Sequence, residues 1–206
     1  MAESMLEIVG VTAGYGRTMV LFDVDVSIPV GSGAAVMGHN GAGKTTLLRV
    51  AVGLIPVKSG KVLLDGEDVT RMRPNQRVKR GLGYVPQGQL CFPQMTTMEN
   101  LQLVVRLFHM TGAEARRRSG ALLERFSLDD AADRVVQGYS GGMRRRLDIA
   151  MSLIAEPSVL FLDEPTTGLD PRSRLEMWDV IDGLVADGTT LLLTTQYLDE
   201  AERLAD

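Results

Sequence analysis

The chain has 206 residues, of which 45% are hydrophobic and 5% aromatic, with 22 Lys and Arg against 26 Asp and Glu. Its length fits one α/β domain with a small subdomain, and its net charge of −4 argues against nucleic acid as a partner, which usually leaves a basic footprint. The single cysteine, Cys91, excludes an internal disulfide.

No apolar stretch approaches the length of about 20 residues that spans a bilayer. The first five residues, Met-Ala-Glu-Ser-Met, lack the apolar core of a signal peptide. We therefore expect a soluble, cytoplasmic protein in which any work at a membrane requires a partner.

The apolar patterns predict strands and helices in alternation. Strands are predicted at residues 5–11, 21–28, 34–37, 61–64, 82–85, 158–162 and 189–194. Helices are predicted at residues 47–52, 141–155, 171–187 and 198–205, with a helical insertion over 97–126 that is broken at Thr111 and Gly112. Because strands and helices alternate, we expect a mainly parallel sheet with helices on both faces.

A glycine-rich segment joins the predicted strand 34–37 to the predicted helix 47–52. It reads Gly38-His39-Asn40-Gly41-Ala42-Gly43-Lys44-Thr45-Thr46. Gly, four residues, Gly, Lys and Thr, set between a strand and a helix, form the phosphate-loop pattern. The glycines let backbone N–H groups point at phosphate oxygens, and the helix start adds a partial positive charge. The segment predicts a nucleoside triphosphate site in which Lys44 reaches the β- and γ-phosphates and Thr45 ligates Mg²⁺.

Two adjacent carboxylates, Asp163 and Glu164, end the apolar strand 158–162. Beside a phosphate loop, Asp163 is expected to hold Mg²⁺, directly or through water. Glu164 is expected to accept a proton from the attacking water. Two charges at a strand end that meets solvent remain the alternative interpretation.

A third motif, Tyr139-Ser140-Gly141-Gly142-Met143, opens the predicted helix 141–155. A serine at a helix start, followed by two glycines, offers N–H groups and a helix dipole to an anion. In isolation the motif favours a simple N-cap over an anion site. The chain therefore has a second candidate anion-binding helix start, far from the first in sequence.

In this order, residues 38–46, 140–142, 161–165 and 168–170 resemble the nucleotide-binding domain of an ATP-binding-cassette (ABC) transporter over essentially the whole chain. The resemblance implies an α/β P-loop NTPase: a RecA-like core of mainly parallel strands, a small antiparallel β lobe and a helical subdomain. We expect one domain over residues 1–206, with core and β lobe at about 1–95 and 156–206 and the helical subdomain at about 96–155.

The resemblance also implies roles for individual residues. Residues 140–142 would be the signature loop, which closes over ATP held by the phosphate loop of a second nucleotide-binding subunit. Gln87 would touch Mg²⁺ and link to a transmembrane permease, and Tyr15 would stack on adenine. Asp170, in Gly168-Leu169-Asp170, would couple the two sites across the dimer.

Position 196 departs from the family pattern, because Gln196 stands where a histidine usually contacts the γ-phosphate. The two histidines of the chain, His39 and His109, are predicted to be surface residues, and neither can replace it from its place in sequence. An amide can still donate a hydrogen bond to a phosphate oxygen, but it cannot ionise. Our hypothesis is that Gln196 fills this catalytic role.

The two halves of the chain resemble different branches of the family. Up to about residue 93 the sequence resembles branched-chain amino acid importer ATPases, and from about residue 97 it resembles daunorubicin-type drug exporters. A divergent single member and a chimera both explain this. The chain also stops at Asp206, where the family normally continues, so we expect a truncated C-terminus and an exposed sheet edge.

These observations predict an ATP-binding and ATP-hydrolysing subunit that is peripheral on the inner face of the cell membrane and powers a separate permease, with export favoured. The alternatives are an importer subunit, an ABC ATPase acting on DNA or ribosomes, and a weakly hydrolysing nucleotide-gated dimerisation module. The arginine runs 116–118 and 144–146 are predicted to be solvated helix faces. The sequence does not name the transported substrate.

Overall fold

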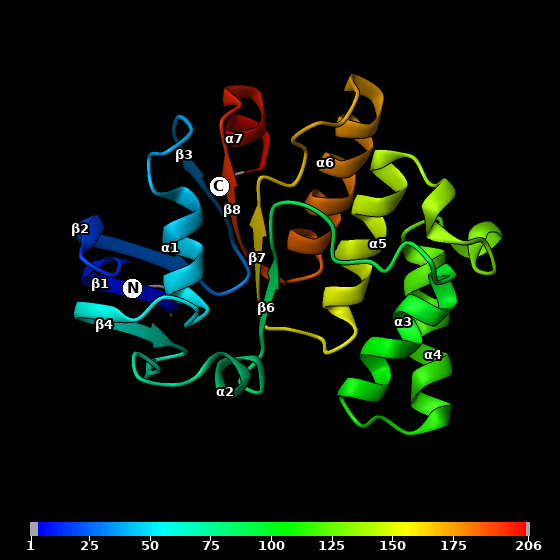
Figure 1. Ribbon diagram of the computed structural model, residues 1–206, viewed down its shortest axis with the longest axis horizontal. Coiled ribbons are helices and arrows are strands. Elements are labelled where there is room, and N and C mark those ends of the chain that lie inside the picture. Colours follow the sequence, from blue (N-terminus) through cyan, green and yellow to red (C-terminus); the bar gives the residue numbers. More distant parts are fainter. Residues whose placement is uncertain (1–3, 205–206) are drawn as a thin grey trace.

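Two four-stranded sheets organise the computed structural model, which describes residues 4–204 (Figure 1). The antiparallel sheet has the order β2-β1-β4-β5 and contains β1 (Ser4–Tyr15), β2 (Thr18–Pro29), β4 (Val57–Leu64) and β5 (Glu67–Asp68). The parallel sheet has the order β3-β8-β7-β6 and contains β3 (Gly33–Met37), β8 (Thr190–Thr195), β7 (Val159–Asp163) and β6 (Leu82–Val85). The predicted combination of a parallel core sheet with a small antiparallel lobe is confirmed.

Helix α1 (Lys44–Ala51) lies between the two sheets (Figure 1). Its apolar side packs with buried residues of both sheets in one core cluster that includes Leu48, Ile8, Val62, Phe161 and Leu192. The alternation of β1 turns Leu6 and Ile8 toward this core. The phosphate-loop helix is thus held on two sides by apolar contacts.

Every residue of β7 and β8 is buried, because helices cover both faces of the parallel sheet. On the face away from α1 lie α5 (Gly141–Leu153), α6 (Pro171–Ala186) and α7 (Leu198–Leu204). Leu160 and Leu162 of β7 face this side and share a core cluster with Ile149 of α5 and Ile181 of α6. Figure 1 shows α5 and α6 running alongside the sheet.

The helical insertion contains α3 (Thr97–Leu107) and α4 (Gly112–Arg125), followed by two 3-10 turns, η1 (Asp129–Ala131) and η2 (Val136–Gly138). Thr96 caps α3, where its side chain accepts a hydrogen bond from Glu99 N, and Thr111 caps α4 in the same way. The break at Thr111 and Gly112 therefore falls where the sequence predicted it. Among residues 4–204, no helix is both long enough and apolar enough to cross a membrane.

Several element boundaries differ from the prediction. Helix α1 begins at Lys44, three residues before the predicted start, because the end of the phosphate loop forms its first turn. The short helix α2 (Pro74–Val78) was not predicted; a proline at its first position and a capping hydrogen bond between Arg73 N and the Gln76 side chain start it. Residues 1–3, and residue 205 of the predicted last helix, lie outside the described residues.

Candidate active site

A cleft of about 460 Å³ lies where the β1–β2 hairpin meets the carboxyl end of the parallel sheet. It is lined by Tyr15, Val20, Asn40, Gly41, Gly43, Lys44, Thr45, Thr46, Gln87 and Glu164. These residues come from segments that are far apart in sequence, and all of them except Val20 belong to the predicted site. The structure therefore brings the phosphate-loop, Q-loop and strand-end motifs to one place.

The backbone of the phosphate loop depends on glycine at two positions. Gly41 and Gly43 have φ of 86° and 97°, in the left-handed region that side chains disfavour. A Cβ at Gly43 would also lie 3.2 Å from the side chains of Val20 and Leu21, which β2 brings against the loop. Gly43 caps α1, so this conformation directs the loop into the first turn of the helix.

Lys44 points its ammonium group back across the loop. Its Nζ donates to the carbonyl oxygens of Gly38 and His39, at 2.8 and 3.2 Å, and pairs with Glu164 Oε1 at 3.1 Å. The side chains of Lys44 and Glu164 are only 5% and 6% exposed, so both charges are buried and paired. Removing either partner leaves the other charge buried without its ion-pair partner, which is unfavourable.

Three hydroxyl groups converge on Asp163 at the end of β7. Thr45 Oγ1 and Thr194 Oγ1 donate to Oδ1 at 3.0 and 2.7 Å, and the Tyr84 hydroxyl donates to Oδ2 at 3.3 Å. Burial, reinforced by the charge of Asp163, raises the pKa of Tyr84 to about 12, so this hydroxyl keeps its proton. The donors fix the Asp163 carboxylate beside the hydroxyl of Thr45.

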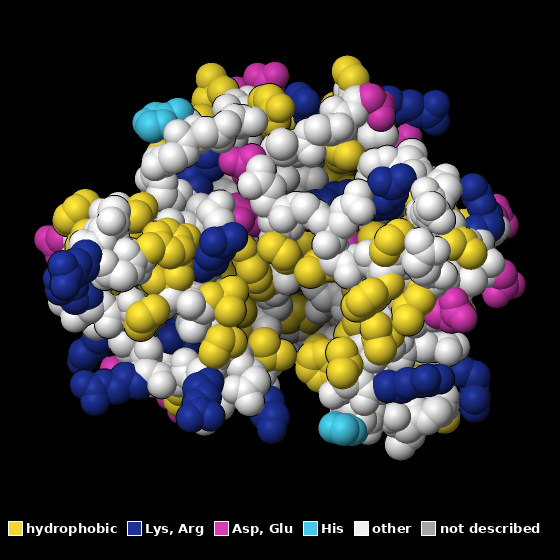
Figure 2. All heavy atoms as spheres, viewed as in Figure 1, with side chains coloured by type: hydrophobic (Ala, Val, Ile, Leu, Met, Phe, Trp, Pro, Cys, Tyr) yellow, Lys and Arg dark blue, Asp and Glu magenta, His cyan; other side chains and the backbone are white. Residues whose placement is uncertain are grey.

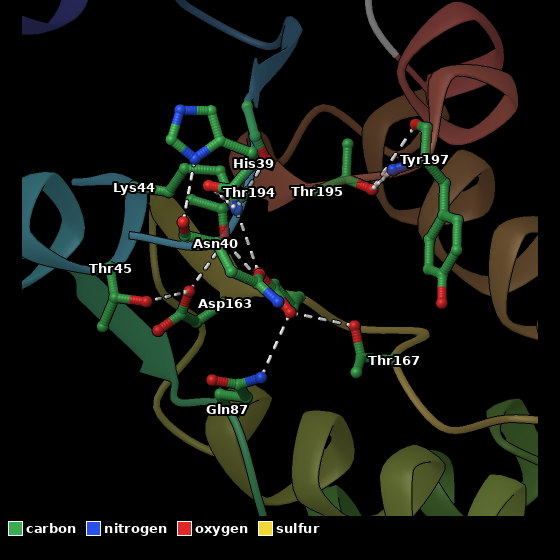
Figure 3. Close-up of polar contacts among 12 residues, drawn as sticks. His39, Asn40, Lys44, Thr45, Gln87, Asp163, Thr167, Thr194, Thr195 and Tyr197 are labelled. Atoms are coloured by element: carbon green, nitrogen blue, oxygen red, sulfur yellow. Dashed lines mark hydrogen bonds and ion pairs between the residues drawn. The ribbon is translucent and has the colours of Figure 1, made fainter. Parts of the chain in front are cut away.

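Glu164 has an unusual backbone and a firmly held side chain. Its φ of 45° is left-handed, and its N–H donates to the carbonyl and hydroxyl oxygens of Thr194 at 3.1 and 3.0 Å. Its Oε2 accepts from Gln87 Nε2 at 3.1 Å and from Thr167 Oγ1 at 3.0 Å (Figure 3). In Figure 3, Lys44, Gln87 and Thr167 reach the same carboxylate from three directions.

Tyr15 stands at the rim of the cleft at the end of β1 and is 47% exposed. Its hydroxyl accepts a hydrogen bond from Arg49 Nη1 at 3.3 Å, and this bond raises the pKa of Arg49. Tyr15 and Arg49 also line a neighbouring groove of about 690 Å³. The other residues that line this groove are Gly14, Gly16, Leu54, Ile55, Pro56, Tyr84, Pro86 and Leu90.

The remaining predicted site residues do not line this cleft. Ser140 is exposed and caps α5, where its Oγ accepts from Met143 N at 3.2 Å. Asp170 caps α6, and two hydrogen bonds from Ser173, at 3.0 and 2.7 Å, lower the pKa of Asp170. Gln196 is exposed and directly follows Thr195, whose carbonyl accepts from Gly38 N.

Sequence reasoning missed several residues of the site, and its interpretation of one was wrong. Arg145 is not on a solvated helix face: it is 6% exposed, and its guanidinium donates to backbone carbonyl oxygens. Burial lowers the pKa of Arg145. Thr194 and Tyr84 were also missed, although both lie near the carboxyl ends of strands that flank β7, where parallel strands gather functional groups. Nothing in the sequence distinguishes Arg145 from the arginines on either side of it.

Comparison with known proteins places this arrangement among ATP-binding cassettes. A family model described as "ABC transporter" matches residues 21–167. The daunorubicin resistance ATP-binding protein DrrA3 of Streptomyces coeruleorubidus is 48% identical over 206 residues, which cover 100% of this chain and 65% of that protein. The Nod factor export ATP-binding protein I of Cupriavidus pinatubonensis is 42% identical over 98% of this chain and 62% of that protein.

A solved structure, the dimeric post-hydrolysis state of the ATP-binding cassette MJ0796 bound to ADP and Pi, superposes with a TM-score of 0.83 at 26% identity. The match covers 97% of this chain and 91% of the solved one. The predicted P-loop NTPase fold and the resemblance to daunorubicin-type ATPases are confirmed. The predicted importer character of the N-terminal half is not shown by these comparisons. The chain spans less than two thirds of the length of the curated relatives it matches.

Proposed function

The chain belongs to the ABC transporter ATP-binding domain family, and we propose that it binds and hydrolyses ATP with Mg²⁺ to power export through a separate membrane permease. One observation supports this most directly: Lys44 and Glu164 pair in one cleft, and Asp163, at the buried strand end just before Glu164, accepts a hydrogen bond from Thr45, which lines the same cleft. A cation, a hydroxyl–carboxylate pair and a second carboxylate are the groups that phosphoryl transfer to water requires.

Nucleotide binding would use the groups that line the cleft. The N–H groups of the phosphate loop and the N-terminus of α1 would bind the phosphates, together with Lys44. Lys44 is now satisfied by two carbonyl oxygens and by Glu164, and a phosphate oxygen would replace these partners. Tyr15 at the rim offers its ring to the base, because an aromatic face and a nucleobase stack well.

The donor set suits Mg²⁺. Thr45 and Asp163, joined by a hydrogen bond of 3.0 Å, offer a hydroxyl and a carboxylate oxygen, and Gln87 adds an amide oxygen from across the cleft. These are the hard oxygen ligands that Mg²⁺ prefers, and Mg²⁺ usually needs only one or two carboxylates beside phosphate and water. When bound, Mg²⁺ would supply a positive charge at the phosphate oxygens.

Glu164 is the proposed general base, which takes a proton from the attacking water. In the present arrangement its carboxylate is occupied by Lys44, Gln87 and Thr167. When Lys44 turns to phosphate, Glu164 loses its cation and gains a free oxygen that faces the cleft. Gln87 and Thr167 would then hold the base in place. This exchange would keep Glu164 paired until phosphate replaces it as the partner of Lys44.

We infer that a second nucleotide-binding subunit completes the site. The signature loop (residues 140–142) and Asp170 do not line the cleft of their own chain, and Ser140 and Gly141 are exposed. Their free helix start would contact ATP held by the partner's phosphate loop. MJ0796, similar over 97% of this chain, is described as a dimer.

The permease is proposed to dock beside the Q-loop. The 690 Å³ groove there combines apolar side chains such as Leu54, Ile55 and Leu90 with Tyr84, which bonds Asp163 in the active site. Figure 2 shows apolar side chains gathered in the notch between the two lobes. A permease segment in this notch would touch residues next to Gln87, and the permease would keep the chain at the inner face of the cell membrane.

Export is favoured over import because the drug-resistance and Nod factor export proteins match nearly the whole chain. Gln196 follows the last core strand and lies beside the phosphate loop. It is proposed to donate an amide hydrogen bond to the γ-phosphate once ATP is bound.

ATP hydrolysis by the purified chain tests the proposal. The Glu164→Gln variant should bind ATP and lose about 10²- to 10⁴-fold in turnover, because an amide cannot accept the proton. The matched Glu124→Gln variant, on an exposed face of α4, should hydrolyse ATP at the parent rate. If Glu164→Gln retains parent turnover, the assignment of the base is wrong. If the parent binds ATP and dimerises without turnover, the chain is a nucleotide-gated dimerisation module.

A further inference from the structure

Arg145 lies in the second turn of α5 and makes an unusual set of contacts. It is 6% exposed, and no carboxylate of residues 4–204 forms an ion pair with it; burial dominates its electrostatics, with Asp148 and Asp163 among the nearby charges. A guanidinium has five donors in a fixed plane, so it can join backbone segments that no lysine could join in the same way. Its hydrogen bonds join the segment around Glu164 to the segment around Gln87.

Two of these contacts bracket Glu164. Arg145 Nη2 donates to the carbonyl oxygen of Asp163 at 3.0 Å, and Nε donates to the carbonyl oxygen of Pro165 at 3.0 Å. The acceptors lie immediately before and after Glu164. Because Glu164 has a left-handed φ of 45°, its backbone conformation persists only where the surroundings hold it. Arg145 supplies part of that support through these two carbonyl oxygens.

The other two contacts bracket Gln87. Arg145 Nη1 donates to the carbonyl oxygen of Pro86 at 2.9 Å and to that of Gly88 at 3.3 Å. One guanidinium thus fixes the backbone around both residues whose side chains meet at 3.1 Å in the cleft. The Q-loop is otherwise exposed at residues 87–90, so few other contacts hold it.

The helix that carries Arg145 begins with the signature loop, four residues earlier. Asp148, one turn further along α5, accepts hydrogen bonds from Leu90 N and Cys91 N at 3.0 and 2.8 Å. The first two turns of α5 are therefore bonded to the Q-loop segment and to the end of β7. A shift of this helix must move those backbone segments or break their bonds.

We propose that Arg145 is a positioning residue that sets Gln87 against Glu164 and ties both to the position of the signature helix. The inference rests on the proposed function. In a dimer, contact of the signature loop with ATP in one site would reach the general base of the other site through this guanidinium. Arg145 itself touches no reacting group.

The test compares Arg145→Gln and Arg145→Lys with the matched variant Arg146→Gln. Arg146 is the next residue of α5, and its side chain donates to the carbonyl oxygen of Phe126 at the end of α4. Two quantities are measured: the kcat and KM of ATP hydrolysis, and hydrogen–deuterium exchange by segment. Both Arg145 variants should lose about tenfold or more in kcat while KM changes by less than about threefold, because positioning acts on the transition state. Exchange should rise together in segments 86–91 and 163–168 and stay unchanged elsewhere. Arg146→Gln should match the parent in both measurements.

The outcomes separate this inference from the proposed function. Parent-like kcat and parent-like exchange in the Arg145 variants would overturn the inference while leaving the ATPase proposal intact. Faster exchange throughout the chain in Arg145→Lys, which keeps the charge and most of the side-chain volume, would show a general structural role and also overturn it. If the parent chain does not hydrolyse ATP, the proposed function fails, and the exchange measurement alone decides whether Arg145 holds the two segments.

Discussion

Two helix starts in this molecule are alike in sequence chemistry and unlike in their surroundings. Helix α1 begins after Gly43 and α5 begins after Ser140, and neither has an acidic residue in its first turn. At α1, the ends of β6 and β7 bring Gln87 and Glu164 into the same cleft. At α5, Ser140 and Gly141 at the helix start are exposed. One turn later, the buried side chain of Arg145 donates to the backbone carbonyl oxygen of Pro165.

The difference shows that a helix start offers positive potential to an anion but does not decide its chemistry. Chemistry requires a cation, a carboxylate and a metal ligand opposite the bound group, and at α1 the same chain supplies Lys44, Glu164 and the Thr45–Asp163 pair. At α5 the opposing groups would come from a second copy. Substitutions at the two helix starts test this division.

Removing the cation should have the largest effect. Lys44→Ala should reduce ATP turnover about 10²- to 10³-fold, the range expected when a preorganised charge at the transition state is lost. Steady-state hydrolysis measures this, with Lys58→Ala on the exposed part of β4 as the control. Turnover within twofold of the parent would mean that the cleft at α1 is not the catalytic site.

Mixing two inactive variants tests whether α5 completes the site of another chain. Ser140→Arg blocks the exposed start of α5, and Lys44→Ala removes the cation at α1; each alone should be inactive. After equal mixing, about half of the dimers contain one copy of each variant. Each of these mixed dimers has one site in which both the phosphate loop and the signature loop are intact. About half of the dimers with one of two sites working should give about one quarter of parent turnover. No recovery in verified mixed dimers would show that both helix starts act within one chain.

The buried side of α5, where Gly142 packs against Ser173 of α6, should tolerate an added side chain less well than an exposed helix position. A Cβ at Gly142 would lie 2.9 Å from Ser173 Oγ and 3.0 Å from its Cβ, so Gly142→Ala should destabilise the chain by about 1 to 3 kcal/mol. Gly120→Ala in α4, which meets no atom within 4 Å, should instead stabilise it by about 0.5 to 1 kcal/mol. Urea unfolding measures both, and equal effects would contradict the close packing at Gly142.

Cys91 reports on the junction between α5 and the Q-loop segment. Burial, with Asp148 nearby, raises the pKa of Cys91 to about 12, so the reactive thiolate is scarce at neutral pH. A disulfide reagent should label Cys91 slowly in the folded chain at pH 8 and faster as the pH rises toward that pKa. Labelling in denaturant gives the control rate. Equal rates in folded and unfolded chains would show that this junction is open.

The separate motifs were readable in sequence because each is local. The phosphate loop needs its glycines at fixed offsets from Lys44, and the apolar run before Asp163 predicts a buried strand end. The same locality explains the errors. Helix α2 is too short to show a helical periodicity of apolar residues. Arg145 lies between two other arginines, Arg144 and Arg146, so the local sequence predicts a solvated run of charge. Its contacts lie 18 to 59 residues away, where no local pattern reaches them.

The sequence alone identified the phosphate-loop pattern, the two strand-end carboxylates and the serine at the start of α5, since each motif consists of neighbouring residues. The order β3-β8-β7-β6 was decided only by tertiary packing, and it places Thr194 and Tyr84 on the two sides of Asp163. Burial also explains why Lys44 and Glu164 form an ion pair and why Arg145 bonds to backbone carbonyl oxygens rather than facing water. A charge removed from water must find partners, and these come from distant parts of the chain.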